Sequence, residues 1–147
     1  DFLDSTQVHI AISLHNMIPN ERQEIMPIEK AYKIEDVIEL LKQYDWTGQR
    51  RLTFEYIVFK NLNDDYRHIF SLVSNLSDIE CRINLIRFHT IPNTIFQQAD
   101  DKDMIKIRDI LTSKGLIATI RASRVENILA ACGLLSTKKL LSLPVKN

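Results

Sequence analysis

Short apolar runs alternate along the chain with segments in which apolar residues recur at helical spacing. The runs are rich in β-branched and aromatic residues, which favour strands. Between them, apolar residues follow an i, i+3, i+4, i+7 pattern that places them on one face of a helix, as from Ile34 to Leu41. The pattern predicts strands over 8–14, 51–59, 81–88 and 116–121, and helices over 34–44, 66–76, 100–114 and 124–132.

This order of elements predicts an α/β fold, because strands joined by helices pair in parallel through right-handed crossovers. We expect one domain over 1–147, an open sheet or barrel sector with helices outside it, and a tail at 136–147. The strand at 8–14 should be buried on both faces. The helix at 66–76 should turn these residues inward: Tyr66, Ile69, Phe70, Val73 and Leu76. Ligands of such sheets bind beyond the carboxyl ends of the strands.

Composition removes several classes of protein. The chain has 147 residues, of which 45% are hydrophobic and 26% charged, and this balance excludes a disordered protein. Two cysteines exclude a disulfide scaffold and a zinc site built from cysteine. No segment approaches the roughly 18 apolar residues that span a bilayer. We therefore expect a cytoplasmic protein without membrane association, no bound metal held by this chain, and a monomer.

The net charge of zero conceals an asymmetry. Residues 105–147 contain eight basic and two acidic residues, so the C-terminal third is basic. Such a segment suits a phosphate backbone, where lysine and arginine gain affinity by releasing counterions. The alternative is an ordinary solvated helix face.

Few residues stand out for chemistry from the pattern alone, since the chain has no glycine-rich phosphate loop and no HExxH or GxSxG motif. His15 and His89 each follow a predicted strand and are either site groups or structural histidines. Cys81 is expected to be a small buried apolar residue. Cys132, with small neighbours, is either an accessible thiol or a buried structural one.

Six segments together carry a resemblance. Ala11-Ile12-Ser13-Leu14-His15, Met26-Pro27-Ile28, Thr53-Phe54-Glu55-Tyr56, Leu62-Asn63-Asp64, Ile83-Asn84-Leu85-Ile86 and Ala130-Ala131-Cys132-Gly133 occur in the order and approximate spacing of one protein family. Over residues 7–135 the chain resembles the C-terminal half of the RlmN/Cfr family. These are radical S-adenosylmethionine (SAM) methyltransferases that act on an adenine of large-subunit ribosomal RNA.

The resemblance implies the second half of a partial (βα) barrel. Ser13, Leu14 and His15 match the segment that contacts SAM, and His89 stands where the family has an asparagine that also contacts SAM. Cys132 matches the cysteine that is methylated by one SAM and then attacked by the radical made from a second. In the family, the cysteines that hold the 4Fe–4S cluster lie upstream of the matched segments.

The leading hypothesis is therefore a fragment of a radical SAM enzyme that methylates C2 of an adenine in 23S ribosomal RNA, and of transfer RNA, with structured RNA as its partner. We expect the fragment alone to be inactive. Two alternatives stay open, namely a diverged radical SAM paralogue with another substrate and a non-catalytic RNA-binding domain. An upstream Cys-x3-Cys-x2-Cys motif would favour an enzyme.

Overall fold

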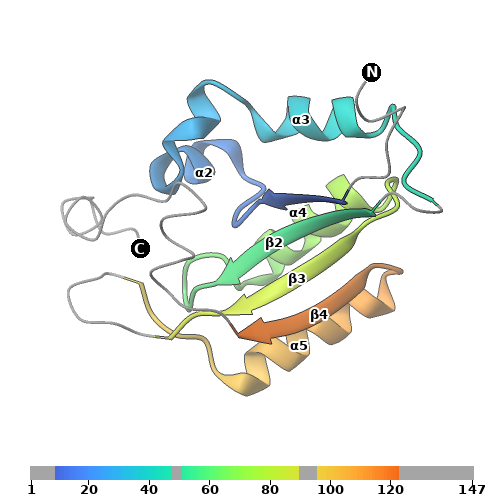
Figure 1. Cartoon of the computed structure of the whole chain (residues 1–147). Coiled ribbons are helices and arrows are strands. Elements are labelled where there is room, and N and C mark those ends of the chain that lie inside the picture. Colours follow the sequence, from blue (N-terminus) through green and yellow to red (C-terminus); the bar gives the residue numbers. More distant parts are fainter. Residues whose placement is uncertain (1–8, 48–50, 90–95, 123–147) are drawn as a thin grey trace.

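The computed structural model describes residues 9–47, 51–89 and 96–122, and it shows a four-stranded sheet (Figure 1). The strands are β1 (His9–Ser13), β2 (Arg51–Val58), β3 (Arg82–Arg87) and β4 (Ile117–Ala122). They lie in the order β1-β2-β3-β4, and every neighbouring pair is parallel. The predicted contiguous parallel sheet is confirmed.

Helices connect the strands of this sheet. They are α2 (Pro19–Ile25), the 3-10 helix η1 (Pro27–Lys30), α3 (Ile34–Leu41), α4 (Tyr66–Leu76) and α5 (Asp101–Ser113). In Figure 1, α4 and α5 lie behind the strands. Phe54, Ile83 and Ala118 share one register row and point into the core beneath these helices. None of the helices in the described part of the chain is long and apolar enough to cross a membrane.

The opposite face of the sheet carries polar side chains. Ser13, Glu55, Asn84 and Thr119 form one register row across the four strands. The first three are half-buried and Thr119 is exposed, so no described helix covers this row. β1 is accordingly not buried on both faces, because its residues are exposed or half-buried. The prediction of a doubly buried strand was wrong because Ile10 and Ile12 pack against the core on one face, while no described helix covers the other face.

The buried face of α4 also differs from the prediction. Tyr66 and Phe70 are 54% and 47% exposed, whereas His68 and Leu72 are buried. The two aromatic rings stack on each other on the outer surface, 5.7 Å apart, and Lys106 of α5 lies over the Tyr66 ring. The apolar periodicity allowed either face, and packing against the sheet selected Ile69, Leu72 and Leu76.

Two short elements were not predicted as helices. Pro19 occupies the first turn of α2, where its missing N–H costs nothing, and Pro27–Lys30 form η1. Residues 124–132, predicted to be helical, and the tail at 136–147 lie outside the described residues.

Candidate functional site

The segment that follows β1 is fixed in an unusual backbone conformation. His15 has a φ of 58°, in the left-handed region that few residues other than glycine adopt, and its side chain is fully buried. The ring nitrogen Nδ1 accepts a hydrogen bond from the backbone N–H of Ile57 at 2.9 Å. The ring therefore occupies the place that a further β1 residue would take beside β2.

The two ring nitrogens of His15 differ in their hydrogen bonding. Nδ1 accepts the backbone N–H of Ile57, so the neutral ring carries its proton on Nε2. Burial, together with the nearby positive charge of Arg22, lowers the pKa of His15 to about 3, so the ring is neutral near pH 7. Nε2 is buried and has no hydrogen-bond partner within the described part of the chain. Such a donor is costly to bury alone, and a polar ligand at this edge would satisfy it.

A buried arginine holds the carbonyl groups just before His15. Arg22 of α2 donates from Nη2 to the carbonyl of Ser13 at 2.9 Å and from Nε to the carbonyl of Leu14 at 3.1 Å. Its Nη1 pairs with Glu29 at 2.7 Å, and the same carboxylate oxygen accepts the N–H of Ile34. Both charged side chains are almost completely buried. The pair thus joins the start of α3 to the end of β1.

Asn63 joins the ends of β1 and β2. Its side-chain amide donates to the carbonyls of His15 and Ile57, each at 2.7 Å, and its oxygen accepts the N–H of Phe59 at 2.8 Å. The hydroxyl of Tyr56 donates to the carbonyl of Asn63 itself at 2.7 Å. The sequence placed Asn63 in a turn and in one of the family segments but assigned it no role. Its place in that segment was the only signal that the sequence offered.

The other two predicted site residues, His89 and Cys132, are not among the groups described around His15. His89 lies just beyond β3 and is exposed, and no described contact brings it to His15. The neighbouring Phe88 packs edge-on against Phe59 at the end of β2, and Phe96 stacks on Phe59 with ring centroids 4.0 Å apart. These ring contacts hold Phe96 at the carboxyl edge of the sheet. Cys132 lies outside the described residues.

A second charged cluster borders the same edge. Both ring nitrogens of His68 hydrogen-bond carboxylates, Nδ1 with Asp65 at 2.5 Å and Nε2 with Glu21 at 2.7 Å. Partial burial acts to raise the pKa of Glu21, but hydrogen bonds from His68, Arg67 and Asn16 outweigh it and lower that pKa. The cluster ties α2 to the start of α4.

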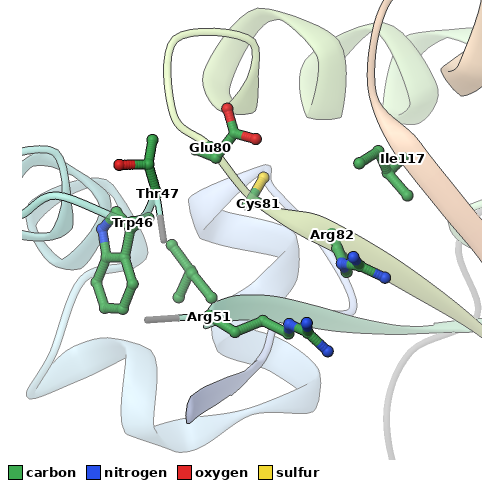
Figure 2. Close-up of a pocket in the computed structure, with 8 residues that line it drawn as sticks. Trp46, Thr47, Arg51, Glu80, Cys81, Arg82 and Ile117 are labelled. Carbon is green, nitrogen blue, oxygen red and sulfur yellow. The ribbon is translucent and has the colours of Figure 1, made fainter. Parts of the chain in front are cut away.

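The opposite end of the sheet holds a separate pocket of about 210 Å³ (Figure 2). It is lined at the amino ends of the strands by residues that include Arg51, Arg82 and Cys81. Burial, and then the charge of Glu80, raise the pKa of the Cys81 thiol to about 12. Cys81 is half-buried rather than buried as expected, because it lines this pocket. Its raised pKa keeps the thiol protonated and poorly nucleophilic.

The chain is similar to proteins that are named as RNA methyltransferases. No family model matches the chain. Proteins described as "Probable dual-specificity RNA methyltransferase RlmN" match it over 138 residues, at 54% identity in Parabacteroides distasonis and 50% in Porphyromonas gingivalis. The "Dual-specificity RNA methyltransferase RlmN" of Aliarcobacter butzleri is 41% identical over 133 residues. Over nearly its whole length the chain is therefore similar to part of the RlmN proteins.

The match covers 94% of the chain and 40% of the Parabacteroides distasonis protein, so the chain spans about two fifths of the length of this relative. The resemblance predicted from the six segments is thereby confirmed.

Solved structures agree on the fold. A radical SAM methyltransferase from Sphaerobacter thermophilus superposes with a TM-score of 0.76 at 31% identity, covering 92% of this chain and 41% of that protein. A domain of pyruvate-formate lyase-activating enzyme from Bacteroides vulgatus shares the fold, with a TM-score of 0.60 at 20% identity. The predicted fold, parallel strands of a radical SAM barrel with helices outside, is confirmed.

Proposed function

We propose that the full-length protein containing this chain is a radical SAM enzyme that methylates C2 of an adenine in 23S ribosomal RNA, and of transfer RNA. The observation that carries the proposal is 50–54% identity to RlmN proteins over 94% of the chain. The TM-score of 0.76 to a radical SAM methyltransferase supports it independently. As a ribosomal RNA enzyme it would act in the cytoplasm, as a monomer.

The carboxyl edge of β1 fits a bound SAM. Ser13 lies in the polar row on the face that no described helix covers, and two residues later the buried Nε2 of His15 lacks a partner among the described residues. We propose that Ser13, Leu14 and His15 bind SAM, and that His89, at the end of β3, also contacts it. A fixed, neutral imidazole can donate one hydrogen bond without carrying charge toward the positive sulfonium.

The cluster ligands must come from elsewhere in the full-length protein. The described residues contain no group of three His, Cys, Asp or Glu side chains that could hold a metal ion. The whole chain has two cysteines, fewer than the set that ligates a 4Fe–4S cluster. We propose that this chain supplies the cofactor-binding edge and the methyl-carrying thiol. When bound, the cluster supplies the electron and SAM supplies both the methyl group and the radical.

Cys132 is the residue to which we assign the first methyl transfer. Its thiolate forms an S–C bond to the methyl carbon while the sulfonium–methyl bond of SAM breaks and S-adenosylhomocysteine leaves. The thiolate is the nucleophilic form of the cysteine, and it is the form that we propose accepts the methyl group. The basic C-terminal third would face the phosphates of structured RNA.

Mass spectrometry of the full-length protein tests this assignment. The protein is reconstituted anaerobically and incubated with SAM labelled on its methyl group, and its peptides are then analysed. Label on the peptide that contains Cys132 supports the proposal. An active enzyme that stays unlabelled at Cys132 contradicts the carrier role. Binding of RNA without any methyl transfer by the reconstituted protein would favour a non-catalytic RNA-binding domain, and methyl transfer to another substrate would favour a diverged paralogue.

A further inference from the structure

Asn63 uses both N–H donors and the oxygen of its side-chain amide on the backbone of the candidate SAM site. Its two N–H groups go to the carbonyls of His15 and Ile57, and its oxygen takes the N–H of Phe59. All three bonds are 2.7–2.8 Å long, and Asn63 is completely buried. An aspartate or leucine of nearly the same size could not make this set of bonds.

These bonds replace a sheet ladder that has ended. The β1–β2 pairing stops at Ser13 and Glu55, with one further bond from the N–H of Leu14 to the carbonyl of Glu55. Beyond that point, His15 turns into the left-handed region and leaves the ladder. Its carbonyl then depends on Asn63, while its ring holds the N–H of Ile57. Asn63 and the His15 ring thus fix His15 from two sides.

The turn that carries Asn63 is itself anchored. The hydroxyl of Tyr56, a fully buried residue of β2, donates to the carbonyl of Asn63, and the backbone N–H of Asn63 reaches back to the carbonyl of Phe59 at 3.4 Å. These bonds hold the Asn63 amide in place without the help of a ligand.

We propose that Asn63 is a positioning residue for SAM, which holds the Ser13-Leu14-His15 segment in its binding conformation without touching the cofactor. The proposal rests on the proposed function, in that it assumes this edge binds SAM. Without the amide, the carbonyl of His15 loses its partner, and the residue can relax out of its sparsely populated backbone conformation. The Nε2 donor would then no longer be aimed at the site.

The test uses the anaerobically reconstituted full-length protein and three variants. Asn63→Asp keeps the size and the acceptor but removes both donors. Tyr56→Phe removes only the bond that anchors the turn, and it keeps the fold testable if Asn63→Asp does not fold. Leu111→Ala is the matched control, because Leu111 is buried in α5 and makes no described contact with Asn63 or His15. For each protein, SAM affinity, RNA affinity and the urea midpoint of unfolding are measured.

We expect Asn63→Asp to weaken SAM binding at least about tenfold and Tyr56→Phe about threefold, as loss of buried hydrogen bonds implies. RNA affinity should change less than about twofold, and Leu111→Ala should bind SAM as the wild type does despite a comparable loss of stability. If Asn63→Asp and Tyr56→Phe lower the urea midpoint but bind SAM with wild-type affinity, Asn63 is purely structural and the proposal is wrong. If the wild-type protein itself fails to bind SAM, the proposed function fails instead.

Discussion

Removing the charge of Arg22 should destabilise the protein strongly, because Arg22 neutralises a carboxylate that water does not reach. In the wild type, Arg22 and Glu29 are 4% and 3% exposed and their charged groups are 2.7 Å apart. Arg22→Met keeps most of the aliphatic stem, yet it leaves Glu29 with only the N–H of Ile34 as a described partner. Breaking a buried pair in this way costs about 3–5 kcal/mol. The carbonyls of Ser13 and Leu14 lose their donors at the same time.

The loss is large against the 5–15 kcal/mol of stability that is typical of a folded domain. A double-mutant cycle separates the pair from the packing around it. Arg22→Met, Glu29→Gln and the double variant are unfolded in urea in the full-length protein and followed by circular dichroism. We expect Arg22→Met to cost about 4 kcal/mol, and the double variant to be more stable than the sum of the single losses by at least about 1.5 kcal/mol. A coupling energy below about 0.5 kcal/mol would show that the two side chains act independently and would refute the reasoning.

Three further predictions follow from individual side chains. The pKa of His15 is lowered to about 3, so the unfolded chain binds a proton that the folded chain does not between pH 6.5 and 3. The free energy of unfolding of the wild type, relative to that of His15→Gln, should therefore fall by about 1.4 kcal/mol for each pH unit below 6. If urea unfolding gives the same difference between the two proteins at pH 7.5 and pH 5, this prediction is wrong. Cys132→Ala should abolish methylation of RNA while leaving the circular dichroism spectrum unchanged, whereas retained methylation would exclude the carrier role. Cys81, whose thiol pKa is raised to about 12, should react with a disulfide reagent at pH 8 much more slowly in the native protein than after unfolding, and equal rates in the two states would contradict the raised pKa.

The sequence was sufficient for the fold because each strand is a local signal. Four β-branched or aromatic runs separated by helices permit few arrangements, and the parallel order followed from topology rules. The face of α4 was ambiguous, because Tyr66 and Phe70 fit the same periodicity as the residues that are buried. α2 was not predicted, because it has only seven residues and most of them are polar.

The sequence indicated where the candidate site lies, but it did not indicate which groups hold His15 in place. The position of His15 after a predicted strand was enough to select it, since ligands gather at that edge. The groups that hold it were not predictable, because they act across the fold. Asn63 is 48 positions from His15, and Ile57 is 42 positions away. Such contacts depend on the register of β1 against β2, which no local pattern specifies.

The most direct test of the account is the product formed on RNA. The full-length protein is reconstituted anaerobically and supplied with SAM, a reductant and 23S ribosomal RNA that lacks the modification, and the RNA is digested to nucleosides for mass spectrometry. The account predicts 2-methyladenosine in the wild-type reaction and none with Cys132→Ala. A reconstituted protein that cleaves SAM but leaves every adenine unmethylated at C2 would contradict it.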